Sequence, residues 1–304
     1  MGRKIVAVAG ATGNAGREIV RALAAKGHHV RALVRNPERL GPAKDFCAEI
    51  RTVQVTQPDT LKSALDGVEV LISALGKTFQ KDKISRRAID VDANVNLFAA
   101  AREAGVARVG LVTVATAHPD HPVAMIAMKG EVEQRLQAAG LPWVIIQPSG
   151  YFSDMWEIFQ MCARGTLWLL GDGAMRFNPI SLLDLGDFIA ETVLSDGAAG
   201  AKHPIGGPEV MTANDIADRA ERVLGKKVKR RHVPMWVARA GVAAIRPFSR
   251  NLWELGDFFV GQVRFAERAL GNDATLPAYG TRRLEDYFRE RWEAEQAVAQ
   301  RALP

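Results

Sequence analysis

Short apolar runs alternate with amphipathic stretches through the first half of the chain. Ile5–Ala9 and Val30–Val34 have the length and composition of buried strands. Between them, Gly16–Lys26 carries apolar residues at helical spacing, and Gly27 follows as a stop signal. This pattern predicts a strand, a helix and a second strand in succession.

The same alternation continues to about residue 148. Four more runs are predicted to be strands: Val53–Val55, Val68–Leu75, Val109–Val114 and Trp143–Ile146. Three intervening stretches are predicted to be helices: Pro58–Asp66, Ala88–Ala104 and about Val123–Ala139. Strands that alternate with helices of this length predict a parallel sheet covered on both faces, which is a doubly wound Rossmann fold of the α/β class.

Beyond Pro148 the pattern changes. Residues 150–178 have a loop-rich composition, a helix is predicted near Leu182–Leu194, and helical patterns dominate from Thr212 onward. With 304 residues, the chain is long enough for two domains. We therefore expect a Rossmann domain over 1–148 plus about 178–205, and a smaller, mostly helical substrate-binding region over about 149–177 and 206–304.

Composition excludes several classes of protein. The 48% hydrophobic and 24% charged content is that of a globular chain, and the net charge of +6 is too diffuse to predict a nucleic-acid partner. Two cysteines, Cys47 and Cys162, allow no disulfide framework. The apolar runs are shorter than a membrane span, and Ile5–Ala9 is too short for a secretion signal, so we expect a cytoplasmic protein.

Three glycines follow the first predicted strand and open the first helix. Gly10 allows a tight turn, Gly13 lets the backbone approach a pyrophosphate, and Gly16 allows close helix packing. The N–H groups at the start of the helix favour an anion. This context predicts a dinucleotide site, to which the rest of the turn, Thr12, Asn14 and Ala15, also contributes.

The GxxGxxG spacing resembles that of the extended and atypical short-chain dehydrogenase/reductase superfamily. Later segments resemble its NmrA-like, NAD(P)H-binding subgroup: Ile72–Gly76, Asn94–Leu97, Lys129–Glu131, Trp143–Gly150, Asn178–Ser181 and Ile205–Glu209. The resemblance covers about residues 3–225. It implies further cofactor-binding positions at Ser73, Ala74, Leu75, Gly76, Thr113, Lys129, Pro148, Ser149 and Gly150.

The end of the second predicted strand bears on which nicotinamide cofactor binds. An NAD site places an acid here, whereas this chain has Arg35 and Asn36. The guanidinium of Arg35 can hold a ribose 2′-phosphate, and its position matches the NADP-binding arginine of the family. We therefore expect NADPH to be preferred over NADH. The resemblance places an acid for the adenine after the third strand, where this chain has Gln54.

The reaction centre departs from the family pattern. Short-chain dehydrogenases generally use a tyrosine four residues before a lysine, with a serine upstream. Lys129 occupies the lysine position and Thr113 lies near the serine position, but Met125 replaces the tyrosine. Lys129 resembles the lysine that transfers a proton in isoflavone-reductase-like relatives. Alternatively it only binds ribose, or it is an ordinary surface lysine.

Two further segments have alternative interpretations. Tyr151, just after the sixth predicted strand, is a candidate proton donor or substrate-stacking residue, or else a core aromatic. His118 and His121 flank a proline without helical spacing or a third ligand, so we interpret them as a loop and expect no metal site.

The C-terminal region combines charge with apolar stretches. A basic run, Lys226–Arg231, precedes Met235–Ile245, and Leu252–Leu270 is largely apolar. These stretches are interpreted either as membrane-surface attachment or as a roof over the substrate pocket. The brevity of the first stretch and its Arg239 favour the roof.

These features favour NADPH-dependent reduction of a small organic carbonyl or enone, with Lys129 or Tyr151 handling the proton and Thr113 nearby. A second hypothesis is a non-catalytic NADP(H)-binding redox sensor. A third, resting only on the C-terminal region, is a subunit of a respiratory or membrane-linked assembly. Monomer and homodimer both remain open.

Overall fold

The computed structural model describes residues 2–77 and 84–301. Their contacts divide the chain into two compact units. The first unit comprises Met1–Pro148 and Leu185–Pro204, and the second comprises Ser149–Asp184 and Ile205–Pro304. Each unit is therefore built from two separate stretches of chain.

The first unit contains a seven-stranded sheet with the order β3-β2-β1-β4-β5-β6-β8. Its strands are β1 (Ile5–Ala9), β2 (His29–Val34), β3 (Glu49–Thr52), β4 (Val70–Ser73), β5 (Arg108–Val112), β6 (Trp143–Pro148) and β8 (Ala201–Ile205). The five pairs from β3 to β6 are all parallel. The strand order reverses between β1 and β4, where doubly wound sheets bind their ligands. The predicted Rossmann fold is confirmed.

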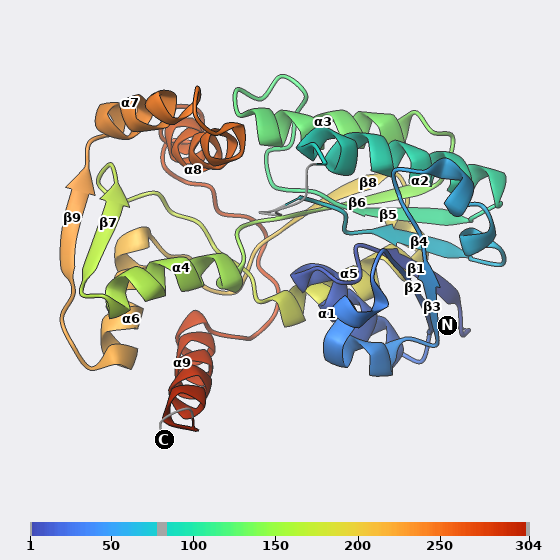
Figure 1. The fold of residues 1–304 in the computed structure, drawn as a ribbon, viewed down its shortest axis with the longest axis horizontal. Helices are drawn as coiled ribbons and strands as arrows, with labels where there is room; N and C mark the ends of the chain where they lie inside the picture. The colour runs from blue at the N-terminus through green and yellow to red at the C-terminus, as the bar shows by residue number, and fades with distance from the viewer. Residues whose placement is uncertain (1, 78–83, 302–304) are drawn as a thin grey trace. The chain divides into compact units, whose positions relative to one another are not determined.

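Helices lie on both faces of this sheet (Figure 1). One face carries α2 (Ala93–Glu103) and α3 (Ala124–Gln137), and the other carries α1 (Asn14–Ala25) and α5 (Leu182–Leu194). The helices α1 and α5 are joined by ion pairs, one of which connects Arg21 to Asp187 at 2.7 Å. The helices predicted from the sequence over these segments are confirmed, with ends shifted by a few residues.

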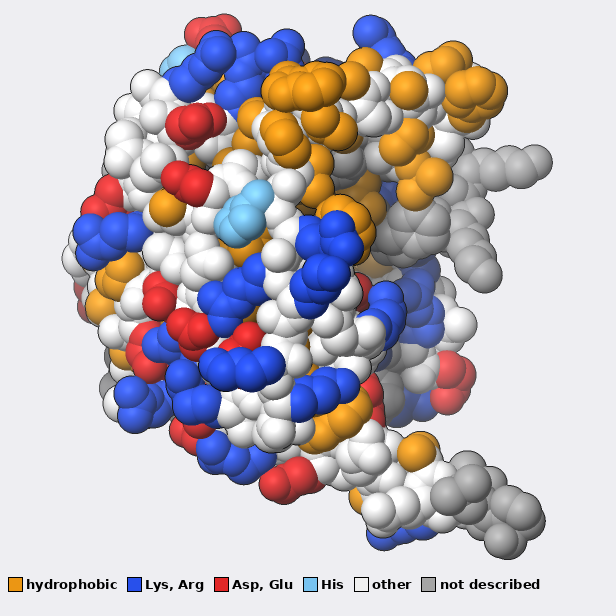
Figure 2. All heavy atoms as spheres, turned by 90° about the vertical axis from the view of Figure 1, so that its left-hand side faces the viewer, with side chains coloured by type: hydrophobic (Ala, Val, Ile, Leu, Met, Phe, Trp, Pro, Cys, Tyr) orange, Lys and Arg blue, Asp and Glu red, His pale blue; other side chains and the backbone are white. Residues whose placement is uncertain are grey.

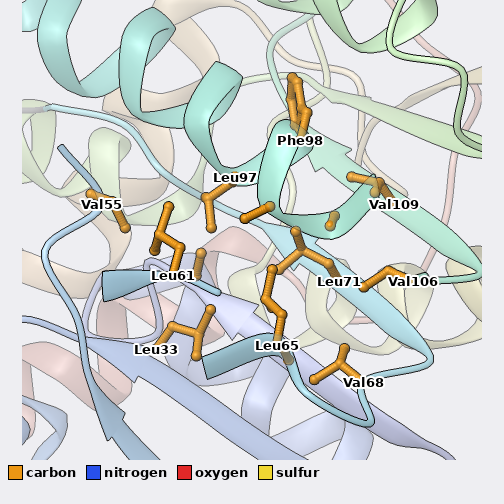
Figure 3. Close-up of a cluster of buried hydrophobic side chains, with 14 of the residues drawn as sticks. Leu33, Val55, Leu61, Leu65, Val68, Leu71, Leu97, Phe98, Val106 and Val109 are labelled. Atoms are coloured by element: carbon orange, nitrogen blue, oxygen red, sulfur yellow. The ribbon is translucent and has the colours of Figure 1, made fainter. Parts of the chain in front are cut away.

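A hydrophobic core fills the space between the sheet and α2 (Figure 3). Leu71 and Val109 contribute from neighbouring strands, and Leu97 contributes from the helix. Burying one such side chain contributes about 1.5–3 kcal/mol to stability. The apolar runs of the sequence therefore form the layer that holds the strand ends in place.

Two sequence predictions near β3 are wrong. The third strand is Glu49–Thr52 rather than Val53–Val55, because an ion pair from Arg31 to Glu49 (2.9 Å) and pairing with β2 set its position. The predicted helix Pro58–Asp66 consists of two short 3₁₀ turns. The hydroxyl of Thr60 donates to the carbonyls of Gln54 and Gln57, and such local bonds compete with a regular helix.

The second unit is mostly helical. It contains α4 (Phe152–Ala163), α6 (Ala213–Leu224), α7 (Met235–Ile245), α8 (Arg250–Ala269) and α9 (Leu284–Arg301), with a parallel strand pair, β7 (Thr166–Leu170) and β9 (Lys229–Val233). Its core is aromatic and includes Trp156, Phe159 and Phe288. Across the described residues, none of these helices combines the length and the apolar character needed to cross a bilayer.

The expectation of a loop-rich stretch over 150–178 is wrong for most of its length. Phe152, Met155, Trp156 and Phe159 all lie on the buried face of α4. Gly165 and Gly171, which lowered the helical character of the stretch, lie in turns with positive φ at the ends of β7. These glycines separate regular elements rather than prevent them.

Candidate functional site

The glycine turn follows β1 directly. Gly10 has a φ of +80°, and a Cβ at this position would lie 2.7 Å from the carbonyl oxygen of Ala74. A Cβ at Gly16 would lie 2.1 Å from the carbonyl oxygen of Gly10. Side chains are thus excluded at both positions, which confirms the tight turn and the close packing of the helix predicted for them.

The N-terminus of α1 has the features of an anion site. The helix begins at Asn14, and Gly13 and Asn14 are exposed. Its first turn, Asn14 to Arg17, contains no carboxylate to compete with an anion. The helix dipole and the first N–H groups therefore favour a negatively charged ligand here.

Two arginines, Arg35 and Arg39, follow the end of β2 along the chain. Arg35 is half-buried directly after the last strand residue, and Asn36 accepts the N–H of Glu38 at 3.0 Å, which starts a 3₁₀ segment. Arg17 of α1 donates to the carbonyl of Arg39 at 2.6 Å. The sequence analysis missed Arg17, although its place in the first turn after Gly16 was a usable signal.

The segment after β4 is held by a buried polar chain. The hydroxyl of Ser73 donates to Asn94 Oδ1 at 2.5 Å, and the Asn94 amide donates to the carbonyl of Asp90 at 2.9 Å. Both Ser73 and Asn94 are fully buried. Because these bonds satisfy the buried polar groups, they hold Ser73 in place at the carboxyl end of β4.

Lys129 reaches this same edge from α3. Its Nζ donates to the carbonyl of Leu75 at 3.2 Å and lies 3.7 Å from Asp90 Oδ1. A Cβ at Gly76 would lie 3.3 Å from this Nζ, so glycine leaves space for the ammonium group. The side chain is 17% exposed, so Lys129 is not an ordinary surface lysine.

Asp90 is a second charged residue that sequence reasoning missed. Its side chain is 3% exposed and lies on a π-helical segment, Ala88–Asp92, that precedes α2. Its Oδ1 accepts the N–H of Lys77 at 2.7 Å, and its Oδ2 lies 4.0 Å from the guanidinium of Arg86. A buried carboxylate requires such partners, and single π-helical turns occur often at functional sites. The sequence around residue 90 carried no signal of this irregular turn.

Thr113 lies at the end of β5, but its hydroxyl is engaged elsewhere. It donates to the buried carboxylate of Glu133 at 2.6 Å. Glu133 also accepts bonds from Gln147 at 2.9 Å and Lys202 at 2.5 Å. The catalytic assignment of Thr113 stays a prediction. Thr116, three residues on, adopts an uncommon positive φ of 63° at the same sheet edge.

The loop with His118 and His121 packs onto α3. A Cβ at Gly130 would lie 2.2 Å from the carbonyl carbon of His118, so the glycine after Lys129 allows this close approach. The rings of His118 and His121 accept backbone N–H groups two residues further on. The segment is a loop, as predicted.

The remaining predicted residues belong to the second unit. The hydroxyl of Ser149 donates to the carbonyl of Asn178 at 2.6 Å. Tyr151 precedes α4, and its N–H donates to Asp154 at 3.2 Å. Burial and the neighbouring Asp154 raise the pKa of the Tyr151 hydroxyl, so this phenol keeps its proton at neutral pH. The roles of Ser149, Gly150 and Tyr151 stay predictions.

Comparisons with known proteins agree with this geometry. A model of a family described as NAD(P)H-binding matches residues 10–193. A (4-alkanoyl-5-oxo-2,5-dihydrofuran-3-yl)methyl phosphate reductase of Streptomyces griseus is 30% identical over 249 residues, 80% of this chain and 82% of its own. Photosystem II assembly factor Ycf39 of Synechocystis is 27% identical over 239 residues, 77% and 72% of the two chains.

Among solved structures, the NADPH complex of an NADPH-dependent quinone oxidoreductase from Escherichia coli superposes with a TM-score of 0.73. It covers 94% of this chain and 99% of that chain at 18% sequence identity. This likeness shows that the two proteins share a fold.

Proposed function

Because this chain belongs to the NAD(P)H-binding family, we propose that it is a reductase that uses NADPH to reduce a small organic carbonyl or enone. The observation that carries the proposal is the placement of Lys129. Its ammonium group lies at the carboxyl edge of the sheet, between the carbonyl of Leu75 and the carboxylate of Asp90. The names of two of the similar proteins, the (4-alkanoyl-5-oxo-2,5-dihydrofuran-3-yl)methyl phosphate reductase and the quinone oxidoreductase, support a reductive reaction.

The residues present fit a dinucleotide phosphate. Gly13 is exposed at the start of α1, where a pyrophosphate would meet backbone N–H groups instead of a side chain. Arg35 follows β2, where the 2′-hydroxyl or 2′-phosphate of the adenosine is bound in such folds. A planar guanidinium suits a phosphate, and an acid that would favour NADH is missing from this position in the sequence.

The proposed chemistry divides between cofactor and protein. NADPH, when bound, supplies the hydride. Lys129 donates a proton from Nζ to the atom of the substrate that gains negative charge, or stabilises that charge beforehand. Leu75 and Asp90 hold Nζ in place, so Asp90 is a positioning residue.

A second candidate function is a non-catalytic NADP(H)-binding regulator. Met125 stands where short-chain dehydrogenases generally have a tyrosine, and its thioether has no proton to donate. The Thr113 hydroxyl already donates to Glu133. One similar protein carries the name of an assembly factor rather than an enzyme. These observations favour a protein that binds the cofactor without turnover.

The test is oxidation of NADPH, followed by absorbance, with a panel of quinones, enones and simple carbonyls. The wild type, Lys129→Met and a matched control, Lys62→Met at an exposed position, are compared at saturating NADPH. Because proton transfer is typically worth about 10²–10⁴ in rate, Lys129→Met should lower kcat by that factor. Lys62→Met should leave kcat unchanged.

Two outcomes would contradict the reductase. One is a wild type that binds NADPH but turns over no member of the panel, which would favour the regulator. The other is a Lys129→Met variant with the kcat of the wild type, which would remove the proposed role of this lysine. Tyr151→Phe, tested beside it, would then show whether the tyrosine hydroxyl donates the proton.

A further inference from the structure

Half of the exposed large hydrophobic side chains lie on one short part of the second unit. Twelve such residues occur in the described part of the chain, and six of them belong to α7, α8 and the turn between these helices. We call these six the α7–α8 surface: Trp236, Val237, Ile245, Phe248, Leu252 and Phe259. Trp236 is 72% exposed and Phe248 is 89% exposed. Exposed apolar groups at this density mark an interaction site.

The packing of the two helices explains why these side chains face outward. A Cβ at Gly256 of α8 would lie 2.9 Å from Cγ2 of Val242 of α7, so the helices meet through small groups. Every residue of α7 is at least partly exposed. The large side chains of α7 are therefore not needed to fill the contact with α8.

Positive charge is concentrated on the same segment. Residues 226–270 contain ten Lys and Arg against three acidic residues, a formal charge of +7, of which the run Lys226–Arg231 supplies five and α7, α8 and the turn between them supply two. Within that run, Lys227 pairs with Glu221 and Arg230 pairs with Asp218, both of α6. The rest of the chain has 30 basic and 31 acidic residues, a charge of −1. Of the three acids, Glu254 is buried and bonded to Arg250, while Arg239, Arg246 and Arg250 are exposed beside the apolar groups.

Figure 2 shows the result. Hydrophobic side chains gather at the top of this view, where α7 and α8 lie, and Lys and Arg side chains lie next to them. Basic groups beside protruding aromatic side chains are the combination found on helices that lie in the interface of an anionic membrane.

We propose that the α7–α8 surface binds the headgroup region of a bilayer containing anionic phospholipid. Trp236 and Phe248 would enter between the lipids, and Arg239 and Arg246 would contact the phosphates. A bilayer accepts protruding side chains without a shaped pocket, which suits the high exposure of both aromatic residues. The exposed Arg239 and Arg246 disfavour the same surface of a second copy, because like charges would be brought together.

This proposal goes beyond the reductase activity and differs from the sequence interpretation. In the sequence, the brevity of the first apolar stretch and its Arg239 favoured a roof over the substrate pocket. The exposure of the α7–α8 surface could not be seen in the sequence, since the same spacing fits a helix packed on either side.

The test is sedimentation of the full chain with large unilamellar vesicles. Vesicles of phosphatidylcholine alone are compared with vesicles that contain phosphatidylglycerol, at low and at high salt. The wild type should bind the anionic vesicles at least about tenfold more tightly, and high salt should remove most of this difference. Trp236→Ser/Phe248→Ser should reduce binding about tenfold or more, and Arg239→Gln/Arg246→Gln should have a similar effect.

Matched controls place the same changes elsewhere. Phe46→Ser/Val298→Ser removes exposed apolar groups outside the α7–α8 surface, and Arg3→Gln/Arg102→Gln removes exposed charges. Both should bind as the wild type does. Circular dichroism checks the fold of each variant. If the aromatic double variant does not fold, vesicle binding by Arg239→Gln/Arg246→Gln tests the proposal instead.

Three results would overturn the proposal. The wild type could bind anionic vesicles no better than neutral ones. Binding could survive both double variants, or fall equally in the controls. Finally, sedimentation without vesicles could show a dimer that Trp236→Ser/Phe248→Ser dissociates while vesicle binding is unchanged, which would assign the surface to a second copy.

Discussion

In the first unit, the candidate site follows the chain order of the strands, whereas the core of the second unit joins distant segments. The glycine turn follows β1, Arg35 follows β2 and Ser73–Gly76 follow β4. In the second unit, Phe159 packs against Phe288 with ring centroids 4.8 Å apart, across more than a hundred residues of sequence. Local sequence patterns therefore predict the candidate site of the first unit, whereas they do not predict the core of the second unit.

The largest expected effect tests whether the two units are energetically separate. Phe159→Ala should lower the unfolding free energy of the second unit by about 3–5 kcal/mol, because it empties a fully buried site. NADPH affinity at low temperature should remain that of the wild type. Calorimetry with and without NADPH measures both.

Leu97→Ala in the first unit is the matched change, with an expected cost of about 2–5 kcal/mol. It should shift the transition that NADPH stabilises, whereas Phe159→Ala should shift the other one. A single transition that responds equally to both variants would show that the division into units has no energetic meaning.

The second prediction concerns cofactor choice in the first unit. Arg35→Ala should weaken NADPH by about 1.5–3 kcal/mol, the contribution of a charge-assisted hydrogen bond, and should barely affect NADH. Titration calorimetry with both cofactors provides the measurement, with the exposed Arg102→Ala as control. Equal weakening of NADPH and NADH would remove the role of Arg35 in selecting the phosphate.

The third prediction concerns the positioning of Lys129. Asp90→Asn keeps an acceptor for the N–H of Lys77 but removes the charge beside Nζ, so kcat should fall by about tenfold. NADPH affinity should change much less, and Asp90→Glu should recover part of the rate. Asp92→Asn, two residues away and 59% exposed, is the control. A kcat equal to that of the wild type would mean that Asp90 only satisfies Lys77 and Arg86.

Only part of the candidate site of the first unit could be predicted from the sequence. The helix α3 followed from a terminating glycine, Lys129 was assigned through the resemblance to short-chain dehydrogenases, and the turn followed from three glycines after a strand. Asp90 could not be found, because a π-helical turn leaves no periodic signal and two of its partners, Lys77 and Lys129, come from other segments.

The second unit was harder for a related reason. The apolar spacing of α4 was present, but the glycines around it suggested loops, and the partner helix α9 lies far along the chain. The edge strand β3 was misplaced because backbone pairing and the bond from Arg31 to Glu49 define it, while the buried Val53 and Val55 lie beyond its end.

The smallest expected effect is a pH dependence at that edge strand. Hydrogen bonds from Arg31 lower the pKa of Glu49 to about 2. A lowered pKa means that the contribution to stability is present above the unfolded-state pKa of about 4.3 and is lost as the pH falls toward 2. Because Glu49 is partly exposed, solvent screening limits this contribution to less than about 1 kcal/mol.

Glu49→Gln should therefore be slightly less stable than the wild type at pH 7, and the two should converge near pH 2 in chemical denaturation. A difference that stays constant across this range would assign the effect to packing rather than to charge.

The central claim is that the glycine turn of the first unit binds NADPH, and titration calorimetry of Gly13→Val tests it most directly. Gly13 has an ordinary φ of −76°, which valine can adopt, although its Cβ would lie 3.2 Å from the carbonyl oxygen of Gly10 and the turn must yield slightly. The rest of the valine side chain would occupy the place of the pyrophosphate. We predict that the variant unfolds in the same cooperative manner as the wild type and loses measurable NADPH binding. Wild-type affinity in a folded Gly13→Val protein would contradict the account.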